Sequence, residues 1–265
     1  SKEMKKKVNL NLVIGIFLIS FVLLFVVVGI FYTPYDPNAM DVLAKNKAPN
    51  MKHLFGTDFL GRDILSRVMK GAGTTFLIGL ATVVIGGTIG TILGAITGYY
   101  GGLLDEILMR INDGLTSFPS ILLALVFVSV LGTGKYNIII ALGVIFIPSF
   151  ARIVRSEYML QKQLDYVKCA KLMGASDFRI MFVHILPNTS KILLSAFAVG
   201  FNNAVLAEAG MSYLSLGVQP PDASLGRMLS EAQTYLFKAP WFAIAPGVMI
   251  IITVLGFSLV SERGR

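Results

Sequence analysis

The residues with the greatest capacity for chemistry lie in a polar insert, residues 152–188, between two apolar segments. Its second half carries Asp165, Lys168, Lys171, Asp177, Arg179 and His184 among apolar side chains. The chain has one further histidine, His53, and its single cysteine is Cys169. One cysteine cannot form an internal disulfide framework or a Cys-based metal cluster, and the two histidines are too far apart in sequence to indicate a metal site or a paired nucleophile and base. The sequence therefore predicts no catalytic residue and no metal ligand, and it disfavours a membrane enzyme.

Two short amphipathic helices joined by a sharp turn are predicted within this insert. Residues 166–173 place apolar side chains on one helical face, and Gly174 suits a left-handed helix stop. Ser176 is a good N-cap for a second helix, whose apolar stripe runs through residues 178–185 until Pro187 ends the pattern. Since neither helix is long enough to cross a bilayer, the element either lies on the membrane surface or docks into a groove of a partner.

A second pattern is a repeat of glycine at every fourth position inside a long apolar segment. Gly86, Gly90, Gly94 and Gly98 fall on one helical face and leave a smooth groove there. Such a groove serves either close helix packing or the lining of a transport pathway. We favour packing, because the segment has no charge that could contact a solute.

The elements that must position these residues are membrane helices. Of the 265 residues, 55% are hydrophobic and 14% are charged, whereas soluble domains carry about a quarter charged residues. We predict an all-α polytopic protein with about six transmembrane helices. Their expected positions are residues 12–31, 71–99, 118–133, 137–151, 192–209 and 241–260.

Basic residues give the expected orientation. The net charge is +8, and in a membrane protein Lys and Arg more often set topology than bind nucleic acid. They are more numerous on the side of the termini and the insert, which are therefore expected in the cytoplasm. We expect residues 1–70 to form a cytoplasmic tail, the first transmembrane helix and an outer segment. Residues 71–265 would form the core with five transmembrane helices, including the insert.

Polar residues near the membrane each allow two interpretations. Glu208, near the outer end of the fifth span, is either a functional carboxylate at membrane depth or an interfacial group bonded to the following loop. Asn202 and Asn203 either face the pathway or bond between helices.

Two charged triplets are expected to be structural. Glu106, Arg110 and Asp113 have the spacing of an ion-pair ladder on a cytoplasmic helix. A second triplet is expected to brace the outer segment beside a compact turn and consists of Asp58, Arg62 and Asp63.

The insert resembles a known motif. "AKLMGASDFRIMFVHILPN" is similar to the cytoplasmic coupling loop, or EAA loop, of bacterial ABC importer permeases. The motif has two small residues, a Gly four positions later and a Leu-Pro pair, which here are Cys169 with Ala170, Gly174, and Leu186 with Pro187. This chain departs from the motif at Lys168, where the family has Glu, and at His184, where it has Ile. By resemblance, the residues that couple to an ATPase are Asp165, Lys168, Cys169, Ala170, Gly174, Ala175, Ser176, Leu186 and Pro187.

Four further blocks, residues 55–68, 98–114, 151–157 and 207–229, resemble the C-type permease of the oligopeptide, dipeptide and nickel systems. The C-terminus departs from that group, which continues past Gly-Asp and Leu-Arg-Asp segments, whereas this chain ends in "SLVSERGR". We therefore expect either a truncated C-terminus or a shorter variant.

The resemblance implies a mechanism in a bacterial inner membrane. A second permease subunit would complete the pathway, one or two ATP-binding subunits would carry ATP and Mg, and an extracytoplasmic solute-binding protein would deliver cargo. This chain lacks the G-x-x-x-x-G-K-[ST] phosphate loop and is expected to need no cofactor itself. The cargo would be a short peptide, nickel or a metal chelate, with the modest length slightly favouring metal. The alternative is a stand-alone channel or secondary transporter, which would need ionisable groups in mid-span.

Overall fold

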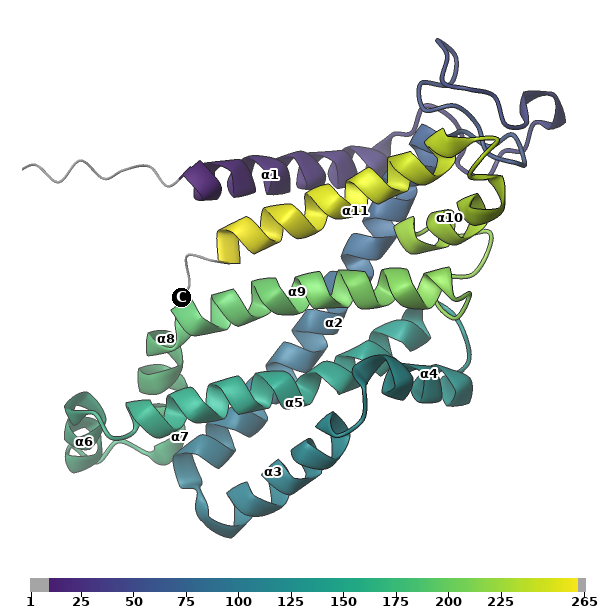
Figure 1. Ribbon diagram of the computed structural model, residues 1–265. Helices are drawn as coiled ribbons and strands as arrows, with labels where there is room; N and C mark the ends of the chain where they lie inside the picture. Colours follow the sequence, from purple (N-terminus) through teal and green to yellow (C-terminus); the bar gives the residue numbers. More distant parts are fainter. Residues whose placement is uncertain (1–9, 262–265) are drawn as a thin grey trace, which may run out of the picture. The chain divides into compact units, whose positions relative to one another are not determined.

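The computed structural model describes residues 10–261, and this part of the chain is almost entirely helical (Figure 1). Its only extended pairing among the described residues is an isolated antiparallel bridge between Thr57 and Asp63. The all-α prediction is therefore confirmed. Most of the predicted cytoplasmic tail, residues 1–9, and the last residues, 262–265, lie outside the described part.

Most helices follow one another with short connections, whereas residues 32–63 separate α1 from α2. The α-helices are α1 (Leu10–Phe31), α2 (Ile64–Tyr100), α3 (Gly102–Thr116), α4 (Ser120–Leu131), α5 (Lys135–Gln161), α6 (Asp165–Leu172), α7 (Asp177–Arg179), α8 (Leu186–Asn188), α9 (Ser190–Tyr213), α10 (Leu225–Ala232) and α11 (Pro240–Ser261). Two 3₁₀ turns, η1 (Val42–Ala44) and η3 (Gln233–Tyr235), and a π-helical segment, η2 (Ile180–Ile185), complete the set.

Five of the described helices are long and apolar enough to cross a membrane, namely α1, α2, α5, α9 and α11. A sixth crossing is possible only if α3 and α4, which are bent by 89°, count as one span. The prediction that residues 118–133 span alone is wrong, because α4 reaches only about 18 Å at 1.5 Å per residue, against a core of about 30 Å.

The segment that carries Glu106, Arg110 and Asp113 forms α3, in agreement with the helix expected there. Gly101 and Gly102 have φ of +68° and +64°, which separates α3 from α2, and Pro119 lies between α3 and α4. Gly132 and Gly134, with φ of +89° and +126°, form the predicted turn before α5.

Several helices run beyond their predicted ends. The second span starts at residue 64 rather than 71, the fourth continues to residue 161, and the fifth covers residues 190–213. Hydropathy marks only the part of a helix that lies in lipid, whereas backbone hydrogen bonds continue into the aqueous segments. The insert outside membrane helices is consequently shorter than expected.

The described residues form two compact units: residues 10–77 with 205–261, and residues 78–204. In the first unit α1 and α11 lie side by side, and Gly15 and Gly256 allow their backbones to approach closely (Figure 1). The core of this unit contains Val26, Ile64 and Phe242. The expected division at residue 70 separates a tail, first span and outer segment from the membrane core. It stays a prediction.

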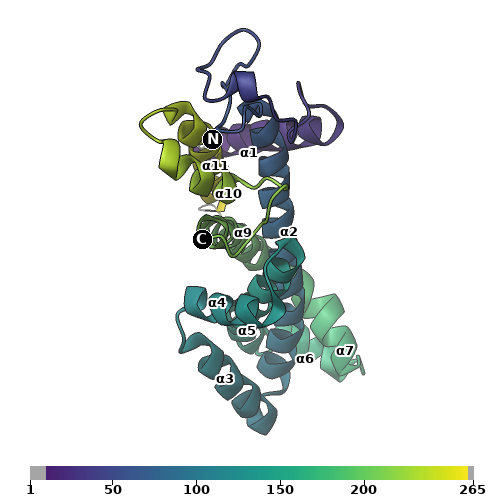
Figure 2. The same ribbon diagram turned by 90° about the vertical axis from the view of Figure 1, so that its right-hand side faces the viewer.

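In the second unit, α5 packs along α2. Figure 2 shows α6 and α7 on the opposite side of α2 from α3 and α4. A separate core joins α2 and α5 to α6 and η2, and in it Ala95, Val154, Tyr158 and Ile180 are at most 2% exposed.

Candidate functional site

The inner face of α6 is packed into the second unit. Val167 and Ala170 are 4% and 5% exposed and belong to the same core as Tyr158, Ile180 and Ile185. One face of this short helix is thereby fixed, and its remaining faces point away from the core.

The turn after α6 has the geometry that the sequence predicts. Gly174 adopts φ of +81°, and its N–H donates to the carbonyl of Lys171 at 3.0 Å. The N–H of Ala175 donates to the carbonyl of Ala170 at 3.1 Å, which completes a Schellman motif. Ser176 then caps α7 by accepting from the N–H of Arg179 at 3.4 Å. The predicted helix stop and N-cap are both confirmed.

The segment after α7 differs from the predicted regular helix. It passes through the π-helical η2 into α8, so Pro187 does not end it but lies within α8. The π-helical turn widens the backbone ahead of Pro187, whose ring cannot follow a regular α-helical turn. The apolar stripe is also shorter than expected, because Phe178 is 69% exposed while Ile180, Met181 and Ile185 are buried.

The other face of this element is exposed and apolar. Leu172, Met173 and Phe178 are 88%, 82% and 69% exposed, and an added Cβ on Gly174 meets no heavy atom within 4 Å. We call these four residues the α6–α7 tip. Exposed apolar patches of this kind are typical of protein–protein or membrane interaction sites.

The flanking residues of α6 are also open to a partner. Asp165 and Lys168 form an exposed ion pair at 3.1 Å, with side chains 94% and 62% accessible, and Cys169 is exposed as well. Of the other residues expected to couple, Leu186 is half-buried and Pro187 is exposed.

Two hydrogen bonds fasten the element that carries the tip to the ends of α2 and α5, and a third joins those two ends to each other. The hydroxyl of Tyr158 donates to the carbonyl of Met181 at 2.9 Å in a buried position. The hydroxyl of Tyr99 donates to Asp177 at 2.6 Å, and Lys162 Nζ donates to the carbonyl of Tyr99 at 3.2 Å. A displacement of the tip therefore pulls directly on two long helices.

The glycine repeat of α2 faces α5. A Cβ on Gly90 would lie 2.5 Å from Phe150 Cβ, one on Gly94 would lie 2.5 Å from the carbonyl oxygen of Ala151, and one on Gly98 would lie 2.6 Å from that of Arg155. Gly86 meets α5 in the same way. The backbone of α5 thus fills the groove, and the geometry supports the packing interpretation over a pathway lining.

A different surface of α5 borders open space. Together with α9 it lines a cavity of about 530 Å³ whose polar groups are those of Ser149, Ser195 and Asn203. Asn203 is exposed there, whereas the neighbouring Asn202 is 7% exposed and does not line the cavity. The cavity has no charged lining residue, so it suits a solute recognised by neutral hydrogen bonds.

Helix α3 is fastened to α5 by ion pairs. Arg155 pairs with both carboxylate oxygens of Asp105, at 2.5 and 2.7 Å. The predicted Glu106–Arg110 pair is present at 2.7 Å, but Asp113 does not continue that ladder. It pairs instead with Arg152 of α5 at 2.9 Å. The spacing of residues along one helix does not predict such a contact between two helices.

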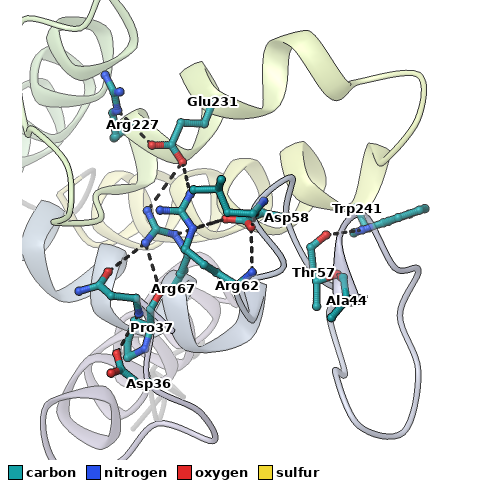
Figure 3. Close-up of polar contacts among 12 residues, drawn as sticks. Asp36, Pro37, Ala44, Thr57, Asp58, Arg62, Arg67, Arg227, Glu231 and Trp241 are labelled. Atoms are coloured by element: carbon teal, nitrogen blue, oxygen red, sulfur yellow. Dashed lines mark hydrogen bonds and ion pairs between the residues drawn. The ribbon is translucent and has the colours of Figure 1, made fainter. Parts of the chain in front are cut away.

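In the first unit, the outer segment holds a buried cluster of charges (Figure 3). Arg62 donates to Asp58 at 2.6 Å and to Glu231 of α10 at 2.8 Å. Arg67 donates to the carbonyl of Pro37 at 3.2 Å and lies within 4 Å of both carboxylates. We call Asp58, Arg62, Arg67, Arg227 and Glu231 the outer charge cluster.

The predicted brace is therefore present but larger than expected. Asp58 also accepts from the N–H groups of Leu60 and Arg62, which fixes the turn between Gly56 and Gly61. Arg67 and Glu231 were not anticipated, and the only sequence signal for Glu231 is its position four residues after Arg227, to which it bonds at 3.2 Å.

Asp63 has a separate role from the outer charge cluster. It accepts from the N–H and hydroxyl of Ser66 at the start of α2, and its other oxygen lies 2.9 Å from His53 Nδ1.

Glu208 lies in the first unit and is fully buried. It accepts from the hydroxyls of Thr75 at 2.9 Å and Ser212 at 2.6 Å. These hydroxyls in turn accept from the N–H groups of Leu225 and Val218, both at 3.1 Å. The geometry thus supports the interpretation that Glu208 is bonded to the following loop, which it ties to α2 and α9.

Nothing among residues 10–261 groups three or more His, Cys, Asp or Glu side chains as a metal site.

Comparison with known proteins gives consistent results. Residues 90–263 match the family described as "Binding-protein-dependent transport system inner membrane component". The glutathione transport system permease protein GsiD of Pectobacterium atrosepticum is 40% identical over 249 residues, covering 92% of this chain and 83% of that protein. GsiD of Escherichia coli O6:K15:H31 is 43% identical, covering 92% and 82%. A chain of the MetNI methionine ABC transporter in inward facing conformations shares the fold, with a TM-score of 0.60, 19% identity and coverage of 74% and 94%.

Proposed function

Because the chain belongs to the family of inner membrane components of binding-protein-dependent transport systems, we propose that the α6–α7 tip is where an ATPase partner drives it. As a family member the chain is a multi-pass protein of the inner membrane and the permease subunit of an ABC importer. It is a transport subunit and not an enzyme.

The observation that carries the proposal is the combination of an exposed apolar tip with a rigid attachment. Leu172, Met173 and Phe178 offer an apolar surface to a groove, which is how amphipathic helices commonly dock. The bonds of Tyr158 and Tyr99 would transmit a movement of the docked tip to α5 and α2. ATP binding in the partner would thereby switch the access of the pathway.

The partners follow from this role. One or two ATP-binding subunits would hold ATP and Mg²⁺, a second permease subunit would complete the pathway, and an extracytoplasmic binding protein would deliver the cargo. No phosphate-loop motif occurs in this chain, so it would contribute movement and not nucleotide binding. With the bent α3–α4 pair counted as one crossing, six crossings would place both termini on the same side of the membrane, and the Lys and Arg bias favours the cytoplasmic side.

We propose a short peptide as the cargo. The relatives at 40 to 43% identity are named for transport of glutathione, which is itself a small peptide. The cavity between α5 and α9 offers the hydroxyls of Ser149 and Ser195 and the amide of Asn203, which suit peptide groups. The expected preference for nickel or a metal chelate gains no support from these relatives. Competition of glutathione, other peptides and nickel for uptake would identify the cargo.

The test of the proposal is Gly174→Asp, with Gly102→Asp as a matched control. Both glycines have positive φ, +81° and +64°, and at both an added Cβ meets nothing within 4 Å. The two variants therefore carry similar backbone strain, but only Gly174 lies in the tip. We expect Gly174→Asp to lower cargo uptake about 10- to 100-fold while the protein stays folded in the membrane, since losing a central docking contact typically costs 2 kcal/mol or more.

The readouts are cargo uptake, ATP hydrolysis stimulated by the binding protein, and copurification of the ATPase subunits. Normal uptake and normal stimulated hydrolysis in Gly174→Asp would overturn the docking assignment. Equal losses in both variants would show that strain, and not docking, is responsible. A chain that purifies without ATPase partners and transports in liposomes without ATP would instead be a stand-alone transporter.

A further inference from the structure

A second cavity lies at the C-terminal end of α2, beside the α6–α7 tip, and shares Lys168 with the residues expected to couple to the ATPase. It has a volume of about 700 Å³ and is bordered by the last two residues of α2, the link after α5, one face of α6 and the start of α7. Its polar lining consists of Tyr99, Tyr100, Lys162, Gln163, Lys168, Lys171 and Asp177.

The charge of this cavity is positive. Its single lining carboxylate, Asp177, already accepts from the hydroxyl of Tyr99 at 2.6 Å. Lys168 has a partner only in the exposed Asp165, a type of pair that contributes little. Lys171 is exposed and forms no ion pair within residues 10–261. Three lysines therefore line a space that has one carboxylate in its lining, which suits a ligand with several anionic oxygens.

The depth of the cavity matches the lipid headgroups. The stretch of α2 from residue 71 to residue 100 carries no charge and is about 45 Å long at 1.5 Å per residue. A bilayer measures about 40–45 Å including its headgroups, so Tyr99 and Tyr100 reach the membrane interface. Tyrosine is enriched at that depth, where its ring meets apolar chains and its hydroxyl meets water.

We propose that this cavity binds the phosphate headgroup of an anionic phospholipid. Basic pockets beside the ends of membrane helices recognise such headgroups, and each nearby Lys strengthens the attraction. The lipid would lie between α2 and α6 and would brace the helix that carries the tip. This inference goes beyond the transport function and depends on neither the cargo nor the docking of the ATPase.

The side chains also distinguish a lipid from an acidic surface of a partner protein. Lys171 lies four residues after the buried Val167 and thus on the face of α6 that turns toward the cavity. Leu172 and Met173, which are 88% and 82% exposed, lie on the remaining face and form the tip. A protein docked on the tip would contact these apolar residues and leave the cavity to the membrane.

The experiment is native mass spectrometry of the transporter with its copurified subunits, released from nanodiscs of phosphatidylcholine with increasing phosphatidylglycerol. The variants are Lys171→Gln and Lys168→Gln, with Lys171→Arg to restore charge. Lys191→Gln is the matched control, because Lys191 is also exposed but does not line the cavity. We expect each cavity variant to bind phosphatidylglycerol about fivefold more weakly, and Lys171→Arg and Lys191→Gln to bind it normally.

Four results would overturn the proposal. The first is unchanged phosphatidylglycerol binding in both cavity variants, and the second is an equal loss in Lys191→Gln. The third is displacement of the lipid signal by millimolar inorganic phosphate, which would identify a site for soluble phosphate. The fourth is loss of the ATPase subunits with lipid binding unchanged, which would assign the lysines to the partner interface. A failure of the docking test at Gly174 would leave all of these readouts intact.

Discussion

Charged residues cluster in two regions of this molecule, and they are buried in one region and exposed in the other. In the outer charge cluster Asp58, Arg62 and Arg67 are at most 4% exposed, and each acid or base faces an opposite charge. Beside the α6–α7 tip, Asp165 and Lys168 are 94% and 62% exposed. Fixed buried charges serve folding, whereas exposed charges remain available to a partner.

The energetic consequence of the difference is large. A buried ion whose partner is removed keeps its desolvation penalty without compensation, while an exposed ion is simply solvated. Substitutions in the outer charge cluster are therefore expected to lower the stability of the protein. Substitutions in the tip are expected to impair transport while changing the stability little. The predictions that follow test this contrast, from the largest expected effect on stability to the smallest.

Asp58→Ala should produce the largest loss of stability. It leaves Arg62 buried beside Arg67 with Glu231 as their remaining carboxylate, and breaking a buried pair typically costs about 3–5 kcal/mol. It also removes the acceptor for the N–H of Leu60 in the adjoining turn. Thermal unfolding of the purified protein in mild detergent would measure the loss. An unfolding temperature equal to that of the wild type would show that the cluster does not brace the outer segment.

Gly94→Val should lower the free energy of unfolding of the second unit by about 1–3 kcal/mol, because the added side chain overpacks a close contact between two helices. Its Cβ would lie 2.5 Å from the carbonyl oxygen of Ala151 and 2.8 Å from Val154 Cβ. Gly114→Ala is the control, since a Cβ there meets no heavy atom within 4 Å. The same unfolding measurement applies. If Gly94→Val were no less stable than Gly114→Ala, this region would not depend on close packing between α2 and α5.

Asp165→Ala should change the free energy of unfolding by less than about 1 kcal/mol, because its pair with Lys168 is exposed. Its effect is expected in cargo uptake or in the copurification of the ATPase subunits. A loss of stability approaching that of Asp58→Ala would abolish the contrast between the two regions. Normal stability with weaker ATPase association would sharpen it.

Much of the architecture could be predicted from local patterns. The helical class, the first and last spans, the Schellman turn at Gly174 and the cap at Ser176 follow from composition and from single residues with distinctive backbone preferences. The pair of Glu106 with Arg110 also follows, because a helix places residues four apart side by side.

Predictions failed where the deciding neighbour is distant in sequence. Asp113 pairs with Arg152 rather than with Arg110, and Arg62 reaches Glu231 across 169 positions of the chain. The bend between α3 and α4 likewise lies at Pro119, and a hydropathy window does not register the effect of one proline on a span.

The sequence by itself determined that this chain is a helical membrane protein with an amphipathic, glycine-turned element outside the bilayer. It did so because hydropathy, helix periodicity and glycine conformation are properties of neighbouring residues. Only the tertiary structure decided which charges are buried, which helix fills the glycine groove and which face of α6 is free. These outcomes depend on the desolvation and packing of groups that come together only when the chain has folded.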